Sequence, residues 1–409
     1  PRLWAWRSCA HKLSKHGLPY TGRPLSQIAE RRDRMIYFDN SATTCVDAEV
    51  ADRAVEIMCR QFGNPSSLHG VGSSAYTELG IARNQIAKMI AARTGDIYFT
   101  SGGTESNNIA VQGAARARRW GKHIVTTAIE HDSILKACAY LESGGWQVTY
   151  VAPNPDTHHI AAQDIIDAVR DDTVLVSVMF VNNETGEILP IKEIVNGVRK
   201  RNPKTLIHCD CVQGFGKLPF KLHVYDVDMI SASAHKIHGP KGIGALYLRR
   251  PDLVFPLEFG GSQEGKVNPG TESVPLACAF GLASDRALYS MTSNAEKVSD
   301  IRKYLLQLLL TEFPTVHINS PKDGSPFILN VSFPGIESHE LVSFLSLHQI
   351  YLSTGSACTK GAPSHVLNAM NYSPSVIRGA LRISFNKHNT KEEVDMFIQT
   401  LKQFPGFCV

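Results

Sequence analysis

Short apolar runs and amphipathic stretches alternate along most of the chain after Met35. The runs are rich in β-branched and aromatic residues and about four to eight residues long, which is typical of strands buried on both faces. Several of the stretches between them carry apolar residues at helical spacing. We therefore predict strands at residues 97–100, 123–128, 147–152, 174–181, 206–210, 229–234 and 244–249, and helices at residues 74–92, 104–120, 133–143, 161–169 and 192–200.

This alternation of strands and helices predicts an α/β fold with a mainly parallel seven-stranded sheet that is covered on both faces. After about residue 290 the order changes, which predicts a second, smaller α+β domain. We expect a large domain at residues 46–290 and a small domain made of residues 35–45 and 291–409. The elements expected in the small domain are helices at residues 294–313, 338–348 and 391–404 and a strand at residues 327–333.

Composition narrows the class of protein. The chain has 409 residues, of which 43% are hydrophobic and 20% charged, as in ordinary globular proteins. Its net charge of +4 is too small to indicate nucleic acid as a direct partner. No apolar run approaches the roughly 18 residues of a membrane span, so we expect none. The nine cysteines include no C-x-x-C pair, which favours free thiols in a reducing compartment.

The first 34 residues differ from the rest. They hold eight Lys or Arg but only two acids, Glu30 and Asp33, and Met35 stands just before a strand-like segment. We favour the interpretation that residues 1–34 are disordered or upstream sequence and that the working protein begins near Met35, which predicts a cytoplasmic protein. The alternative is a basic mitochondrial presequence, which would predict a mitochondrial one.

The densest chemistry follows the strand at residues 229–234. That strand leads into Ser233, His235 and Lys236 and then breaks into a Gly/Pro loop. A lysine held still and deprotonated at a strand end can form an imine with pyridoxal 5'-phosphate (PLP), which then acts as an electron sink. Ser233 and His235 alternate along the strand, so both can face the cofactor phosphate.

A second segment is suited to an anion. Residues 99–108 read FTSGGTESNN, a Gly-rich turn between a predicted strand and a predicted helix. Gly103 allows a sharp turn, and free N–H groups at the helix start, together with Thr104, suit a phosphate. The motif alone is also typical of an ordinary helix cap.

Polar residues follow three further strand ends. Asp210 ends the strand at residues 206–210, where α/β sheets bind ligands, and can keep the pyridine nitrogen of PLP protonated. Gln213 is close enough in sequence to reach the phenolic oxygen of the ring. His131 can stack on the ring and move protons. Asn183 follows another strand. Together, the polar residues at these strand ends predict one crevice that binds the cofactor.

Two residues near the C-terminus complete the candidate chemistry. Cys358 lies in a loop of small residues, a mobile mount suited to a thiol that must carry sulfur to an acceptor, and Lys360 nearby favours the thiolate. Arg382 lies on an apolar strand, where a guanidinium needs a carboxylate partner. The carboxylate of an amino-acid substrate fits that need.

Taken together, these segments resemble the NifS/IscS-type cysteine desulfurases of the class V aminotransferase group. The resemblance runs from about residue 35 to residue 403 through FGNPSSLHG, TSGGTESNN, VNNETG, SAHKIHGPKG and GSAC, among others. It implies a PLP-dependent transferase of fold type I that works as a homodimer, with the active site at the subunit interface. It implies no metal.

The resemblance also implies a role for each matching residue. Lys236 forms the Schiff base, His131 stacks and moves protons, and Cys358 receives the sulfur. The other implied contacts are Asp210 to the pyridinium, Gln213 to the phenolic oxygen, Asn183 and Arg382 to the substrate carboxylate, and Gly103, Thr104, Ser233 and His235, with Thr271 of the partner subunit, to the phosphate.

Three differences from the family pattern stand out. Gly103 replaces a common Ala and Cys45 a common Pro, and we expect both to be tolerated. Gly265 and Asn268 stand where two arginines are usual. The loop from Cys358 to Pro363 is about two residues shorter than in IscS-like members, so the reach of the cysteine is open.

The implied activity converts L-cysteine to L-alanine and leaves the sulfur on Cys358 as a persulfide. The acceptor could be an iron–sulfur scaffold or a tRNA-thiolation enzyme. A selenocysteine lyase is the nearest alternative function. A silent paralogue serving as a binding scaffold is an alternative of another class, although intact Lys236, Asp210 and His131 disfavour it.

Overall fold

The computed structural model describes residues 35–118, 120–355 and 363–407. From Tyr37 onward the chain forms one compact unit, and the account below concerns this unit. Cys358 lies outside the described residues.

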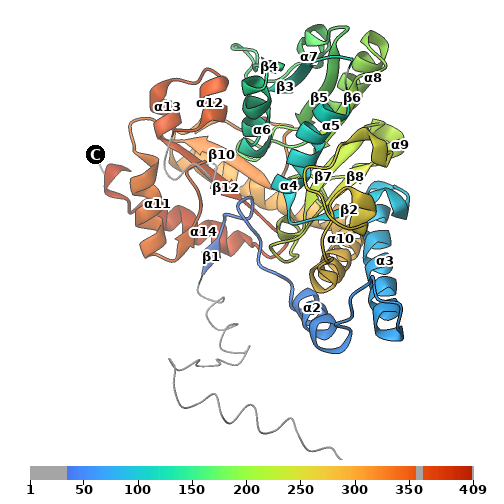
Figure 1. The fold of residues 1–409 in the computed structure, drawn as a ribbon. Coiled ribbons are helices and arrows are strands. Elements are labelled where there is room, and N and C mark those ends of the chain that lie inside the picture. Colours follow the sequence, from blue (N-terminus) through green and yellow to red (C-terminus); the bar gives the residue numbers. More distant parts are fainter. Residues whose placement is uncertain (1–34, 119, 356–362, 408–409) are drawn as a thin grey trace, which may run out of the picture. The chain divides into compact units, whose positions relative to one another are not determined.

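A seven-stranded sheet forms the centre of the fold, as predicted (Figure 1). Only β8 runs antiparallel to its neighbours; the pairs from β7 to β4 are all parallel. Nearly all of these strand residues are buried, which matches their β-branched composition. The strand order is β2 (Ile97–Thr100), β8 (Gly244–Leu248), β7 (Met229–Ser233), β6 (Leu206–Asp210), β5 (Thr173–Met179), β3 (His123–Thr127) and β4 (Gln147–Val151).

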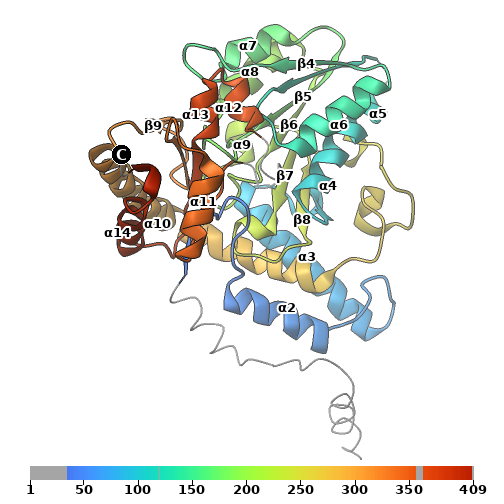
Figure 2. The ribbon, with the colours of Figure 1, turned by 90° about the vertical axis from the view of Figure 1, so that its left-hand side faces the viewer.

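Helices lie on both faces of this sheet. On one face α4 (Gly103–Asn108), α5 (Ala114–Ala117) and α6 (Asp132–Ser143) pack against the strands. Figure 2 shows the strands between these helices and the group on the other side. That group consists of α7 (Ala162–Ala168), α8 (Ile191–Arg201) and α9 (Leu222–Tyr225).

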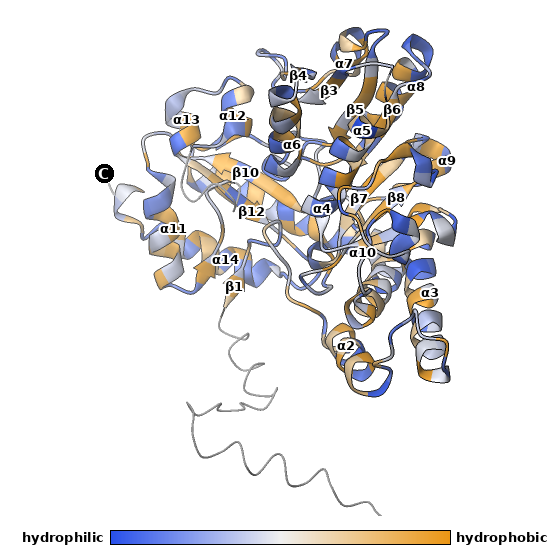
Figure 3. Cartoon of the chain, in the orientation of Figure 1, coloured by the Kyte–Doolittle hydropathy of each residue, from blue (hydrophilic) through white to orange (hydrophobic). Residues whose placement is uncertain are grey.

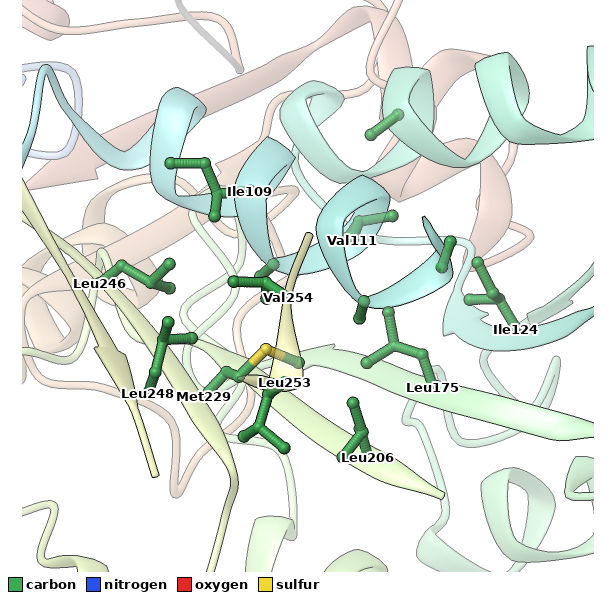
Figure 4. Packing of buried hydrophobic residues seen from close by; sticks show 14 of the residues in the cluster. Ile109, Val111, Ile124, Leu175, Leu206, Met229, Leu246, Leu248, Leu253 and Val254 are labelled. Atoms are coloured by element: carbon green, nitrogen blue, oxygen red, sulfur yellow. The ribbon is translucent and has the colours of Figure 1, made fainter. Parts of the chain in front are cut away.

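The predicted helix at residues 104–120 is interrupted. Between α4 and α5 the backbone forms a π-helical turn at Ile109–Gly113. Its buried residues Ile109 and Val111 face Leu246, Met229 and Leu175 of the sheet, in the hydrophobic cluster drawn in Figure 4. A π-turn inserts one residue into the helical ladder, so the helix keeps its apolar side on the sheet while α4 points toward the strand ends.

A three-stranded antiparallel sheet forms the second layer of structure. Its order is β12 (Ala380–Ser384), β10 (Ile328–Ser332) and β9 (His317–Ile318). β1 (Ile36–Tyr37) precedes Phe38, which donates its backbone N–H to Tyr351. Figure 3 shows the strands coloured as hydrophobic and the helices with mixed faces. The remaining elements are α11 (Ser338–Leu347), β11 (Ile350–Tyr351), α12 (His365–Ala369), α13 (Pro374–Arg378) and α14 (Lys391–Leu401).

The helix α10 (Val274–Glu312) begins 20 residues earlier than the helix predicted at residues 294–313. It packs against α2 (Ala48–Arg60) and α3 (Gly70–Ile90). Its first half includes many small residues, among them Ala277, Cys278, Gly281 and Ser284, which give a weak helical pattern but allow close packing. A Cβ on Gly281 would lie 2.7 Å from the Cα of Ala82. The helix runs through residue 290, where we placed the domain boundary, and that division stays a prediction.

Among the described residues no helix is both long and apolar enough to cross a membrane.

The segment that lacks the family's two arginines is held by a buried carboxylate. Glu264 accepts hydrogen bonds from both terminal nitrogens of Arg83, at 2.7 and 2.6 Å, and from the backbone N–H of Phe99. Glu264 and Gly265 have φ values of 44° and 59°. Asn268 donates to the carbonyl of Phe99 at 3.1 Å. Gly265 and Asn268 therefore belong to a turn that is hydrogen-bonded to β2.

We expect Glu264→Gln to lower the free energy of unfolding by about 2–4 kcal/mol, because it leaves the Arg83 charge without its buried partner. Chemical denaturation of the purified chain measures this. Asp252→Asn, which removes one partner of the exposed Arg250–Asp252 pair, is the matched control and should leave the midpoint unchanged. An unchanged midpoint for Glu264→Gln would show that the turn does not depend on this ion pair.

Candidate active site

The carboxyl ends of β3, β5, β6 and β7 lie at one edge of the sheet because these strands are parallel. There the chain forms a pocket of about 210 Å³. Of the predicted site residues, the pocket is lined by Gly103, Thr104, His131, Asn183, Asp210, Gln213, Ser233, His235, Lys236 and Arg382. It is also lined by Ser41, Ala42, Asn107, Ser133, Met179, Val181 and Val212, which the sequence reasoning did not assign.

Lys236 lies at the end of a short 3₁₀ turn (Ala234–Lys236) that follows β7. Its Nζ donates to the backbone carbonyls of Ser41 and Ala42, the latter at 2.9 Å. These carbonyls belong to the NSATT segment near the start of the described chain. These two backbone carbonyls hold the amine of Lys236 in place.

A chain of hydrogen bonds joins Asp210 to His131. The Nδ2 of Asn107 donates both to Asp210 Oδ2 at 2.7 Å and to Ser133 Oγ at 2.8 Å. Ser133 Oγ lies 2.8 Å from His131 Nδ1, which also accepts from the Ser133 N–H. Asp210 Oδ1 accepts from the Val212 N–H. Both oxygens of Asp210 are therefore fixed, and both functional side chains share one network.

The environment of His131 favours its neutral form. Burial lowers the pKa of His131, and nearby Lys236 lowers it further, while Asp210 opposes these effects. Because Nδ1 accepts from Ser133, we assign the proton of the neutral ring to Nε2. A neutral imidazole can accept a proton as well as stack on a ring.

Strand register brings the two predicted phosphate segments together. Gly244 of β8 pairs with Ser233 on one side and with Thr100 on the other. Gly102 and Gly103 follow Thr100 and so lie beside Ser233. His235 stands next to them, and burial, together with Lys236 and other lysines, lowers its pKa to about 3. This part of the pocket offers hydroxyl and backbone donors at the start of α4.

Gly103 fits this corner for a steric reason. A Cβ at position 103 would lie 2.6 Å from Cγ2 of Val212, closer than two carbon atoms pack. Glycine in place of the family's common alanine at position 103 therefore leaves space for the side chain of Val212, which faces it.

Arg382 is almost fully buried, and two of its nitrogens are engaged. NH2 forms an ion pair with Asp39 at 2.8 Å, and NH1 donates to the carbonyl of Asn183 at 3.0 Å. Its Nε and the Oδ1 of Asn183 make no hydrogen bond within the described parts of the chain. Asp39 is a carboxylate partner that the sequence reasoning missed. The pocket still presents unsatisfied polar atoms from both residues.

Among the predicted site residues that the structure describes, Thr271 does not line this pocket. Thr271 is exposed in the segment before α10. Cys358 falls outside the described residues, but its loop is flanked by positions that are described. Ser353 pairs with Arg382 through two backbone hydrogen bonds, and Ser364 donates to the buried carboxylate of Glu184.

Glu130 is a buried acid that sequence reasoning also missed. Its Oε1 accepts from Thr127 Oγ1 at 2.8 Å and from the Met179 N–H at 2.9 Å. Burial raises the pKa of Glu130 to about 8, although these hydrogen bonds oppose the rise. It precedes His131 directly, so this acid anchors the turn that carries the imidazole.

Comparison with known proteins agrees with this geometry. The family model described as Aminotransferase class-V matches residues 36–397. The chain belongs to the class-V aminotransferase family. The cysteine desulfurase IscS of Methanosarcina thermophila is 40% identical over 375 residues, covering 91% of this chain and 92% of that protein. The resemblance to NifS/IscS-type cysteine desulfurases is thereby confirmed.

Solved structures of this class-V family are similar as well. A structure titled NifS-like protein has a TM-score of 0.86 and 37% identity, and the match covers 91% of this chain and all of that one. A structure titled SspA in complex with cysteine has a TM-score of 0.76 and 33% identity, covering 87% of this chain and all of that one.

Members of this class-V family use PLP, and the pocket fits this cofactor. A lysine amine, a fixed aspartate and an imidazole line it together. At its edge Gly103 lets the backbone at the start of α4 approach the Val212 side chain, where a Cβ would clash. The side-chain oxygens of Ser41, Asn107 and Asn183 have no hydrogen-bond partner within the described residues. Buried polar atoms are rarely left unpaired, and a polar guest in the pocket would give these three atoms a partner.

We expect Gly103→Ala to weaken PLP binding about tenfold or more, because the new methyl forces Val212 to move and Val212 holds Asp210. Equilibrium dialysis of PLP measures the change. Adding Val212→Ala should restore most of the affinity. Gly80→Ala, where a Cβ meets nothing within 4 Å, is the matched control. Wild-type affinity in Gly103→Ala would contradict this steric account.

Proposed function

We propose that this protein is a PLP-dependent cysteine desulfurase that converts L-cysteine to L-alanine and transfers the sulfur to Cys358. The observation that carries the proposal is a single pocket lined by Lys236, Asp210, His131 and Arg382. In the balanced reaction the C–S bond of cysteine breaks and an S–S bond forms. The thiol of Cys358 becomes a persulfide, and the substrate carbon gains a hydrogen to give alanine.

The bound PLP supplies an electron sink that withdraws charge from the substrate α-carbon. The residues of the chain prepare that chemistry. Lys236 would hold the cofactor through its side-chain amine. Asp210 holds a proton on the ring nitrogen, and its fixed oxygens keep it aligned. His131, neutral and hydrogen-bonded through Ser133, accepts and returns protons.

The substrate carboxylate is assigned to Arg382 and Asn183. The Arg382 fork keeps one nitrogen, Nε, without a partner among the described residues. Asp39 neutralises part of its charge and fixes its plane. A second carboxylate approaching from the pocket therefore meets a guanidinium that is already oriented, which lowers the entropic cost of binding.

Cys358 is assigned as the sulfur acceptor within the chain. Gly355 lies three residues before it, so covalent geometry allows its Cα to lie up to roughly 10 Å from that of Gly355. The backbone of Ser353 is bonded to pocket-lining Arg382, which supports delivery of the thiol to this side of the pocket. The acceptor that takes the sulfur onward is proposed to be an iron–sulfur scaffold or a tRNA-thiolation enzyme, and the compartment stays a prediction.

A homodimer is proposed from exposed apolar side chains on α2 and α3 and near the Glu264 turn. A solvent-exposed apolar patch of this kind is typical of a protein interface. The exposed position of Thr271 supports its assignment to the phosphate of the neighbouring protomer. We propose that this patch is formed by Val55, Met58, Phe62, Leu68, Val71, Tyr76 and Phe259, each of which is exposed, Leu68 fully.

The function is tested by measuring alanine, sulfide and protein-bound persulfide with L-cysteine. We expect wild type to form one alanine per sulfur released, and Cys358→Ser to keep PLP but accumulate no persulfide. Cys45→Ser, which removes an exposed free thiol, is the matched control and should behave as wild type. Lys236→Ala should lose all turnover.

Three outcomes would overturn the proposal. Cysteine turnover by Cys358→Ser at the wild-type rate would make that thiol a bystander. A strong wild-type preference for selenocysteine, kept in Cys358→Ser, would favour a selenocysteine lyase. A wild-type chain that binds no PLP would favour a binding scaffold.

We expect light scattering to give the mass of a dimer, and Leu68→Asp to shift the mass toward the monomer because it places charge in the apolar patch. Leu347→Asp, at an exposed position on α11, is the control and should remain dimeric. Thr271→Ala should weaken PLP binding without changing the mass. A monomeric wild type with full PLP affinity would contradict both the interface and the role of Thr271.

A further inference from the structure

A buried lysine lies behind the pocket and has no part in the proposed chemistry. Lys217 belongs to the turn after β6 and is only 7% exposed. Its Nζ donates to Gln213 Oε1 at 3.1 Å and lies 5.8 Å from the centre of the Phe327 ring. No carboxylate among the described residues forms an ion pair with it.

Such a residue costs the fold free energy. An ammonium removed from water needs a partner that replaces its hydration, and one neutral amide replaces only part of it. Burial, together with the positive charges of Lys236 and Arg382, lowers the pKa of Lys217 to about 7. An apolar side chain of similar length would fill the same space without this cost, so stability does not explain the lysine.

The hydrogen bond to Gln213 has a geometric consequence. An ammonium can only donate, so it fixes Oε1 of the amide on its own side. The amino group of Gln213 is then turned the other way. There Nε2 donates to the carbonyl of Ser41 at 2.9 Å, the same carbonyl that accepts from Lys236. The Ser41 carbonyl can accept only from the amide nitrogen, so it favours the same orientation, and Lys217 and Ser41 hold the two ends of the amide together.

We propose that Lys217 is a positioning residue that fixes the Gln213 amide so that its Nε2 donor faces the cofactor pocket. The anionic ring oxygen of PLP would then meet a donor instead of the amide oxygen. The charge behind the amide also polarises it and strengthens that donor. This inference rests on the proposed function, because it requires PLP in the pocket. Lys217 itself does not line that pocket.

The alternative is that Lys217 serves packing alone, and the two roles predict opposite effects on stability. A packing lysine would lower the Tm when it is replaced. A positioning lysine that costs free energy would leave the Tm unchanged or raise it, because Lys217→Met removes an unpaired buried charge. Replacing such a lysine would weaken the binding of PLP instead of the stability of the fold.

The experiment uses the full chain with PLP at one fixed pH. For Lys217→Met we expect an apo Tm at or above that of wild type and a Kd for PLP at least about fivefold weaker, as for the loss of one hydrogen bond. The visible absorbance of lysine-bound PLP should also change, because the ionisation of its ring oxygen is altered. Lys217→Gln keeps a donor toward Gln213 and should restore the Kd to within about twofold.

A double variant tests whether the effect passes through Gln213. In a Gln213→Met background, adding Lys217→Met should change the Kd no further. The proposal is overturned by a wild-type Kd and spectrum in Lys217→Met, by a lowered Tm or loss of folding in that variant, by a Lys217→Gln variant no better than Lys217→Met, or by additive losses in the double variant. Failure of wild type itself to bind PLP would instead overturn the proposed function.

Discussion

The parallel direction of β3, β5, β6 and β7 is the constraint on which the pocket depends. Each strand ends at the same edge, and polar residues stand at these ends or within a few positions after them. The strands themselves are buried on both faces, so the backbone edge is the place where the fold can present donors and acceptors without disturbing the core. Asp210 and His131 are therefore neighbours although 79 positions separate them in the sequence.

Much of this arrangement could be predicted from the sequence. The seven strands have apolar runs bounded by polar residues, and each run was placed within two residues of its final bounds. The polar residues at their ends then had to converge because of the parallel order. Periodicity could not predict the early start of α10, because Ala, Cys, Gly and Ser give little contrast between faces. That part of the helix is specified by close packing against α3.

The missed residues of the site share a physical reason. Asn107 sits on α4, and Asp39 lies in the segment before α2; each acts on a partner far away in the sequence. No local pattern shows that an asparagine bridges two functional groups or that an arginine already has a carboxylate. Lys217 was likewise indistinguishable from a surface lysine. Such contacts depend on tertiary distance and on burial, which a single sequence does not provide.

The continuous helix α10 has a mechanical consequence. At the usual rise per residue its 39 residues extend roughly 58 Å. One end packs on α2 and α3, and the other packs on α14 beside the antiparallel sheet. A continuous helix between these two packing regions is stiff, because bending it would strain its internal hydrogen bonds. The helix therefore resists relative movement of the region around α2 and α3 and the region around α14.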